Sequence, residues 1–233
     1  MTADERIVTF INSLDTKNSE ILEAVEKEAR ASSVPVIRRE MQSFLKTLLL
    51  MRKPMRILEV GTAVGFSALL MSEYAPEGCR ITTIENYEKR IPIARENFRR
   101  AGKEKQIALI EGDAAEVMKK LEGPFDFIFM DAAKGQYIHY LPDALRLLPE
   151  GGVLVSDNVM QDGDVIESRF AVERRNRTIH ARMREYLYEL KHNDALVTSI
   201  LPLGDGVAVS VKRSVSEEMN IQNTQEEENG KTS

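Results

Sequence analysis

The strongest constraint on the fold is an alternation, beginning at Arg56, between short apolar runs and longer amphipathic stretches. This alternation is typical of strands joined by crossover helices, and such strands run parallel. The runs that we interpret as strands are residues 56–60, 80–85, 106–111, 125–130 and 152–157, and the stretches that we expect to be helical are residues 65–75, 88–101, 114–121 and 135–147. The sequence therefore predicts a doubly wound α/β core.

Segments before and after this core predict two additions to it. Two further apolar runs, residues 195–202 and 206–212, are separated only by Leu203, Gly204 and Asp205. Because a parallel crossover needs about a dozen residues, these runs must form an antiparallel hairpin. Residues 1–55 show only helical periodicity and predict a helical cap over the sheet, and a long helical stretch is expected from Asn158 to about His192. We expect one domain, residues 1–213, with the cap at 1–55 and a mostly parallel seven-stranded α/β core at 56–213.

Composition excludes several classes of protein. The single cysteine, Cys79, cannot form an internal disulfide, and the three histidines are too widely spaced to suggest a zinc site. No apolar run approaches the ~20 residues of a membrane span, and the amino terminus is acidic where a signal peptide would be basic, so we expect a cytoplasmic protein.

Residues 214–233 contain five Glu and one Lys and contribute −4 to the net charge of −5, which leaves −1 for residues 1–213. This tail has almost no large apolar residues, and we predict that it is disordered.

The first predicted strand leads through Glu59 into a turn that contains Gly61, Gly65 and Ser67. Glycines at a strand-to-helix turn let the backbone approach a ligand, and the start of the next helix offers free N–H groups. Alanine and phenylalanine replace the other glycines of the dinucleotide fingerprint, so a nicotinamide dinucleotide is not favoured. A tight turn that binds no ligand is the alternative.

Acidic residues follow the second and third predicted strands. Glu85 lies about twenty residues past Gly65, where an acid can accept hydrogen bonds from both ribose hydroxyls of an adenosine. Asp113 lies at the next strand end, where it could meet an adenine amino group. A solvated carboxylate is the alternative for Glu85, and capping of the following helix would suffice for Asp113. Together with the glycine turn, these positions predict a nucleoside-binding crevice.

The fourth and fifth predicted strands end in Asp131 and in the pair Asp157 and Asn158. If these strands are neighbours, two carboxylates and one amide oxygen converge at one edge of the sheet. Ligands of this kind suit Mg²⁺, Ca²⁺ or Mn²⁺. The alternative for Asp157 and Asn158 is a local turn after the strand, whereas Asp131 is harder to explain without a ligand.

The motifs EVGTAVGFSA, TTIE, EGDA, MDAAKGQY, SDNV and PLGDGVAVS occur in this order within residues 59–210, and the resemblance that they carry covers residues 5–212. Together they resemble the cation-dependent S-adenosylmethionine O-methyltransferases, the family of the catechol and caffeoyl-CoA enzymes, and most closely its bacterial tRNA 5-hydroxyuridine methyltransferases. The resemblance implies a Rossmann-like methyltransferase fold and a homodimer. It also implies that S-adenosylmethionine is bound by Ile37, Glu59, Gly61, Ser67, Glu85, Asp113, Ala114 and Asp131. It implies that Mg²⁺ or another divalent cation is bound by Asp131, Asp157 and Asn158, and that Lys134 acts with Asp131 in catalysis, as the base or by orienting the attacking oxygen.

The choice of substrate depends on residues 169–185, which carry six arginines and two glutamates, a local charge of +4. Such a cluster suits an RNA backbone, although a solvated helix face with internal ion pairs is the alternative. The candidate RNA-binding residues are Arg38, Arg39, Arg174, Arg175 and Arg177. The candidates for stacking on a base are Tyr137, Tyr140 and Phe66, although core packing is the favoured role of Phe66. We expect methylation of 5-hydroxyuridine at the wobble position of a tRNA anticodon. A small-molecule catechol or caffeoyl-CoA type methyltransferase is the main alternative, and a non-catalytic nucleotide-binding module or a dehydrogenase is less favoured.

Overall fold

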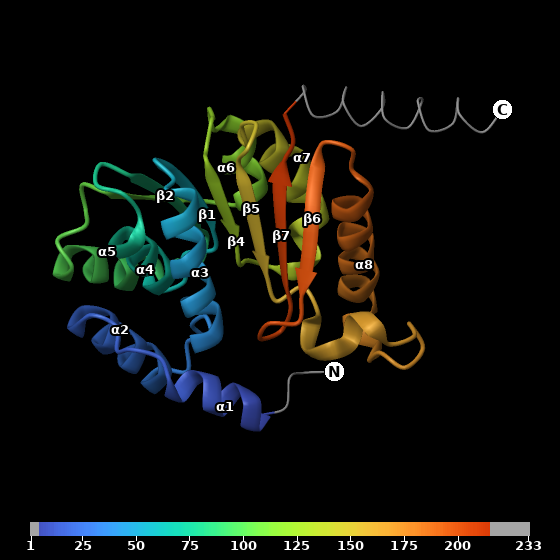
Figure 1. Cartoon of the computed structure of the whole chain (residues 1–233), viewed down its shortest axis with the longest axis horizontal. Coiled ribbons are helices and arrows are strands. Elements are labelled where there is room, and N and C mark those ends of the chain that lie inside the picture. Colours follow the sequence, from blue (N-terminus) through green and yellow to red (C-terminus); the bar gives the residue numbers. More distant parts are fainter. Residues whose placement is uncertain (1–4, 215–233) are drawn as a thin grey trace, which may run out of the picture.

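The computed structural model describes residues 5–214 and is built on one seven-stranded sheet with the order β3-β2-β1-β4-β5-β7-β6. The strands are β1 (Arg56–Val60), β2 (Arg80–Glu85), β3 (Ile107–Glu111), β4 (Phe127–Met130), β5 (Val153–Asp157), β6 (Leu196–Leu201) and β7 (Val207–Lys212). Strands β1 to β5 pair in parallel, whereas β7 is antiparallel to both β5 and β6 (Figure 1). The predicted mostly parallel sheet and its antiparallel hairpin are confirmed. Residues 215–233 of the predicted disordered tail lie outside the described residues.

Helices cover both faces of the sheet. They are α1 (Glu5–Ser13), α2 (Glu20–Ala31), α3 (Arg39–Arg52), α4 (Phe66–Tyr74), α5 (Ile91–Arg100), α6 (Ala114–Lys120), α7 (Tyr137–Leu147) and α8 (Arg177–His192), with short 3-10 turns η1 (Lys134–Gln136), η2 (Gln161–Ile166) and η3 (Arg174–Asn176). Side chains alternate along each strand, so Ile57 packs with α2 to α5 on one face and its neighbour Leu58 packs with α6 to α8 on the other. Within residues 5–214, no helix has both the length and the apolar character of a membrane span.

The predicted cap corresponds to α1, α2 and α3. Met41, Leu45 and Leu49 of α3 are almost fully buried and join the core on the face that also holds α4. Figure 1 shows α1 and α2 on the same side of the molecule as the loop that follows β5. The segment between α2 and α3 is therefore placed to line a site at the carboxyl edge of the sheet.

The segment after β5 differs from the prediction of one long helix. It contains two 3-10 turns, and α8 begins only at Arg177. Asp162 and Gly163 have positive φ angles of 52° and 93°, a left-handed conformation that cannot continue a helix. The prediction was wrong here because helical periodicity in a charged segment was taken to extend across a glycine. Arg174 and Arg175 consequently lie in a 3-10 turn before α8.

Candidate active site

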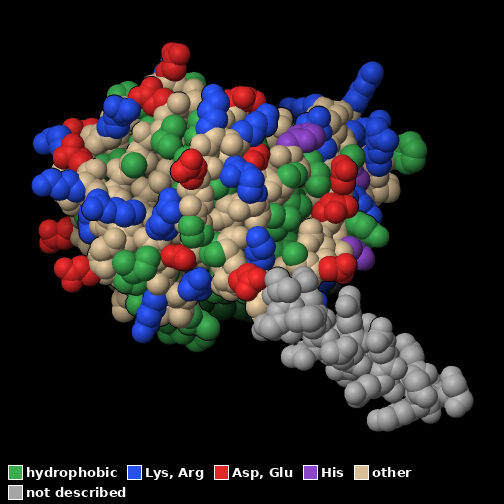
Figure 2. Space-filling view, turned by 90° about the horizontal axis from the view of Figure 1, so that it is seen from above, with side chains coloured by type: hydrophobic (Ala, Val, Ile, Leu, Met, Phe, Trp, Pro, Cys, Tyr) green, Lys and Arg blue, Asp and Glu red, His purple; other side chains and the backbone are tan. Residues whose placement is uncertain are grey.

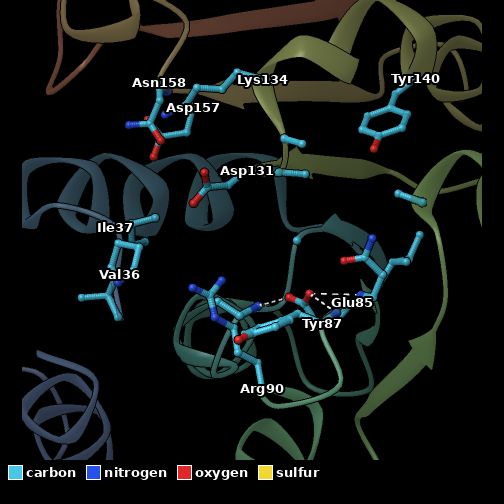
Figure 3. A pocket seen from close by; sticks show the side chains of 18 of the residues that line it. Val36, Ile37, Glu85, Tyr87, Arg90, Asp131, Lys134, Tyr140, Asp157 and Asn158 are labelled. Atoms are coloured by element: carbon cyan, nitrogen blue, oxygen red, sulfur yellow. Dashed lines mark hydrogen bonds between the residues drawn. The ribbon is translucent and has the colours of Figure 1, made fainter. Parts of the chain in front are cut away.

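A cavity of about 570 Å³ opens at the carboxyl edge of the parallel strands. Figure 3 shows Asp131, Asp157, Asn158 and Lys134 gathered toward one end of it, and Glu85, Tyr87 and Arg90 toward the other. The residues selected from the sequence that line it are Ile37, Arg38, Gly61, Glu85, Ala114, Asp131, Lys134, Asp157 and Asn158. Carboxyl ends of adjacent parallel strands are the usual place of ligand sites in open α/β sheets.

The glycine turn is shaped by close contacts with the protein's own backbone and side chains. Gly61 has a φ of +106°, and a Cβ added there would lie 2.1 Å from the carbonyl oxygen of Asp131. At Gly65, with a φ of +84°, a Cβ would lie 2.5 Å from the ring of Phe98. Glycine is therefore required at Gly61 so that the end of β1 can meet the end of β4, and this contact brings the turn to the cavity wall.

Glu85 fixes the same turn from β2. Its carboxylate accepts hydrogen bonds from the backbone N–H of Ala63 at 2.7 Å, of Asn86 at 3.0 Å and of Tyr87 at 2.9 Å (Figure 3). Only 9% of the residue is exposed, yet it lines the cavity. Since each carboxylate oxygen can accept more than one hydrogen bond, Glu85 can both hold the turn and receive the hydroxyls of a ribose.

Two predicted cofactor residues, Glu59 and Ser67, are not among the cavity-lining residues. Glu59 is fully buried beneath the glycine turn, where it accepts hydrogen bonds from the hydroxyls of Ser67 and Thr83. Burial raises the pKa of Glu59 to about 8, and the nearby carboxylates of Asp131 and Glu85 act in the same direction, against the two hydroxyl hydrogen bonds. In this arrangement Glu59 and Ser67 support the glycine turn from the protein interior, and their contact with the cofactor stays a prediction.

The raised pKa of Glu59 predicts a pH-dependent stability. Between its ordinary pKa of 4.5 and about 8, the folded protein binds a proton at Glu59 that the unfolded chain releases. The contribution of protonated Glu59 to the free energy of unfolding is therefore complete below pH 4.5 and is lost as pH rises through 8. Glu59→Gln, which keeps a neutral acceptor, should remove this loss, so that urea unfolding shows a flatter stability profile than that of the natural protein. Identical profiles for the two proteins would mean that Glu59 ionises normally.

Asp113 is explained by helix capping. Its carboxylate accepts hydrogen bonds from the backbone N–H of Ala115 at 3.0 Å and of Glu116 at 3.3 Å, at the start of α6. Asp113 itself is not among the lining residues, whereas its neighbours Gly112 and Ala114 are. The capped turn thus presents backbone to the cavity, and a direct contact of Asp113 with adenine stays a prediction.

The other end of the cavity carries the carboxyl groups of Asp131 and Asp157, with the buried Asp205 also in its lining. Burial is the main cause that raises the pKa of Asp131, and burial together with the Asp131 charge raises the pKa of Asp157 to about 7. Lys134 opposes both shifts. Asn158 has a φ of 56°, and its N–H donates to Asp157 Oδ1 at 2.7 Å, so the local turn considered above is also present. The turn does not account for Asp131, which reaches the same end from a different strand.

This donor set fits a divalent cation. Two carboxylates and one amide oxygen suit Mg²⁺, and a cation would relieve the repulsion between the two acids. Within residues 5–214 no cluster of three or more His, Cys, Asp or Glu side chains offers an alternative metal site. A cation here would therefore depend on Asn158 in addition to Asp131 and Asp157.

The loop that carries Asn158 is held by the tip of the β6–β7 hairpin. The backbone N–H of Val159 donates to Gly206 O at 3.0 Å, that of Met160 donates to Asp205 O at 2.9 Å, and that of Asp162 donates to Asp205 Oδ1 at 2.6 Å. Asp205 also lines the cavity. In the sequence, Asp205 and Gly206 stand out only as part of the motif PLGDGVAVS and receive no role of their own, because their partners lie far away along the chain.

Other lining residues were missed or misassigned. Tyr87 and Arg90 line the end near Glu85 and could have been found by following the chain past that strand end. Tyr140 also lines the cavity, as a base-stacking residue could. Tyr137, another stacking candidate, is fully buried, and its hydroxyl donates to the carbonyls of Met130 and Asp157, so it ties β4 to β5 and cannot stack on a base.

Comparison with known proteins agrees with this site. A model of the O-methyltransferase family matches residues 12–213. The catechol O-methyltransferase of Niastella koreensis is 38% identical over 128 residues, which are 53% of this chain and 58% of that protein, so the chain spans little more than half the length of this relative. An SAH-bound methyltransferase of Podospora anserina has a TM-score of 0.81 and 28% identity and covers 90% of this chain and 95% of its own. An O-methyltransferase of Bacillus cereus in complex with SAH has a TM-score of 0.79 and 25% identity over 89% and 97% of the two chains.

These findings place the protein among enzymes of the Rossmann-like methyltransferase fold. The chain belongs to the O-methyltransferase family.

Proposed function

We propose that the protein is an S-adenosylmethionine-dependent and divalent-cation-dependent O-methyltransferase that converts 5-hydroxyuridine to 5-methoxyuridine at the wobble position of tRNA anticodons. The main support for O-methyl transfer is that two sets of side chains converge in one cavity. Glu85 and the glycine turn lie at one end, and Asp131, Asp157, Asn158 and Lys134 lie at the other. A methyl donor and an ionisable hydroxyl would thus be held face to face.

The chain's own residues supply binding, orientation and proton transfer. Glu85 would accept the ribose hydroxyls of the cofactor, while Ile37 and Ala114 line the same cavity. A divalent cation held by Asp131, Asp157 and Asn158 would supply stabilisation of the substrate oxyanion. Lys134 would accept the hydroxyl proton or orient the oxygen, and we favour the base role. Fixing the oxygen against the methyl group contributes the proximity part of catalysis.

The proposal of an RNA substrate is supported by one arginine in the cavity wall and by further arginines in the cap and beyond the loop of Asn158. Arg38 lines it from the start of α3, and Arg39 follows. Arg174, Arg175 and Arg177 lie beyond the loop that carries Asn158. Figure 2 shows the opposite side of the molecule, at the amino ends of the parallel strands, and there acidic and basic side chains intermingle. Like a catechol, 5-hydroxyuridine has two neighbouring oxygens, O5 and O4, which one cation can bind.

A small-molecule substrate is the second candidate. The Niastella koreensis relative is named a catechol O-methyltransferase, and a 31% identical protein of Populus trichocarpa is named a caffeoyl-CoA O-methyltransferase. Part of the arginine cluster also has internal partners, because Arg182 donates to Gly135 O and Arg184 to Val165 O. Arg175 forms an exposed ion pair with Glu173 at 2.7 Å. These contacts within the protein are what the alternative of a solvated helix face predicts.

The substrate is tested by mass spectrometry of tRNA nucleosides. Deleting the gene is expected to abolish 5-methoxyuridine and to accumulate 5-hydroxyuridine, because the final methylation would be lost. Purified protein with Mg²⁺ and labelled S-adenosylmethionine should methylate tRNA from the deletion strain, and tRNA that already carries the methoxy group serves as the control. Unchanged nucleosides in the deletion strain, together with rapid methylation of free catechols, would instead support a small-molecule substrate. The homodimer and the cytoplasmic location stay predictions.

A further inference from the structure

Phe170 stands out among the apolar side chains of the described chain. It is 87% exposed, the highest value among the exposed large hydrophobic residues, and Ile166 nearby is 62% exposed. Both belong to the segment between β5 and α8, and residues 167–176 of it are called here the Phe170 segment. A single exposed ring is common on protein surfaces, so the case for a partner depends on how the backbone of this segment is held and on the charges beside it.

The backbone of the Phe170 segment is held in place although the ring is exposed. Arg177 donates from its guanidinium to the carbonyl of Val172 at 3.2 Å and to that of Phe170 at 3.4 Å. The side chain of Val172 is only 3% exposed, and the N–H of Ala171 donates to Ser168 O at 2.9 Å. The segment therefore presents Phe170 on an anchored backbone, which lowers the entropy cost of binding a partner through it.

Arginines are frequent in the chain on both sides of Phe170. Residues 167–177 contain four arginines and two glutamates, a local charge of +2. Arg169, Arg174 and Arg175 are all exposed. Glu173 pairs with Arg175, but both partners are exposed to solvent, and such pairs contribute little and exchange readily for other ions. An apolar partner alone would gain nothing from these arginines, whereas a partner with flat rings and phosphates would use both features.

The Phe170 segment is connected to the reacting end of the cavity. The chain reaches it directly from Asn158 through Asp162, and both residues line the cavity. On α8, Arg182 donates to Gly135 O at 3.1 Å, next to Lys134. The helix that directly follows the Phe170 segment therefore packs against the turn that carries Lys134.

We propose that Phe170, Arg169 and Arg174 form a docking platform for single-stranded RNA next to the methylated base. The ring of Phe170 stacks on a base that flanks the target, and Arg169 and Arg174 contact the neighbouring phosphates. This inference rests on the proposed function and adds to it the residues that recognise the RNA outside the cavity. It does not depend on the cation, because neither stacking nor phosphate contacts involve the reacting atoms.

The test measures RNA binding apart from catalysis. Binding of a fluorescent anticodon stem-loop is followed by anisotropy, with S-adenosylhomocysteine and a chelator present so that no transfer occurs. Phe170→Ala is expected to weaken binding about tenfold with an unchanged salt dependence, and Phe170→Trp to restore it. Arg169→Gln with Arg174→Gln should make the salt dependence shallower. Ile93→Ala, which removes a 47% exposed side chain on α5, is the matched control.

The outcomes separate this inference from the proposed function. If Phe170→Ala binds and methylates the stem-loop like the natural protein, the platform is wrong and the tRNA function stands. Stacking-dependent binding without methylation would support the platform and contradict the reaction. A natural protein that neither binds nor methylates RNA overturns both. A rise in KM for free catechols in Phe170→Ala, with RNA binding unchanged, would identify the ring as a cover for a small substrate.

Discussion

Replacing Asp157 by alanine is expected to lower methyl transfer at least about a thousandfold while leaving the affinity for S-adenosylmethionine within about threefold. Asp157 is 4% exposed and lines the cavity beside Asn158. Its side chain is one of the two carboxylates that we propose as cation ligands with Asn158, so its loss removes half of the ligand charge that would hold a cation. The cofactor end, built around Glu85, lies at the opposite end of the cavity (Figure 3).

Cation binding is measured directly, with Mn²⁺ and electron paramagnetic resonance, and cofactor binding by calorimetry. Asp194→Ala, which removes an exposed acid before β6, is the matched control and should change neither. Because Asp157 Oδ1 also accepts the N–H of Asn158, Asp157→Asn is the second variant, since it keeps this acceptor and removes the charge. Equal loss of cation and cofactor binding in both variants would show that Asp157 supports the fold and is not a cation ligand.

The strands could be placed well from the sequence because β1, β2, β4 and β5 are buried on both faces, and each parallel strand ends where a polar turn begins. The predicted bounds 56–60 and 80–85 are those of β1 and β2. Carboxyl ends of parallel strands share one edge, so the residues at these ends, Glu85, Asp131 and Asp157, could be grouped from the sequence alone. The sheet order confirms that β4 and β5 are neighbours.

What the sequence could not provide are contacts between segments far apart along the chain. Glu59 looks like a residue that leads into the glycine turn, but in register it lies opposite Thr83, and that pairing buries it. The hairpin tip at Asp205 holds the loop after Asn158, and only the position of β7 between β5 and β6 reveals this contact. Local patterns identify the strand ends, whereas the packing of distant segments decides which acids face the cavity.

Gly61→Ala is the second change with a large expected effect, because the turn meets β4 without space for a side chain. The new Cβ would lie 2.1 Å from the carbonyl oxygen of Asp131, and backbone must move to relieve the overlap. Gly61 also has a φ of +106°, which adds strain for any other residue. We expect a loss of about 3–5 kcal/mol in the free energy of unfolding and a more than hundredfold weaker binding of S-adenosylmethionine.

Gly102→Ala is the control that separates the cost of backbone strain from the cost of steric overlap. Gly102 has a φ of +65°, but an added Cβ meets no atom within 4 Å, so only about 1 kcal/mol of strain and unchanged cofactor binding are expected. For each variant, urea unfolding gives the free energy of unfolding and calorimetry gives the affinity for S-adenosylmethionine. Both are measured at low temperature, where a destabilised Gly61→Ala protein is still folded. Equal costs in the two variants would mean that β1 and β4 separate easily and that the turn does not need glycine. A cost confined to Gly61→Ala, with cofactor binding lost in a folded protein, would show that the contact between the β1 turn and Asp131 shapes the cofactor end and the cation end together.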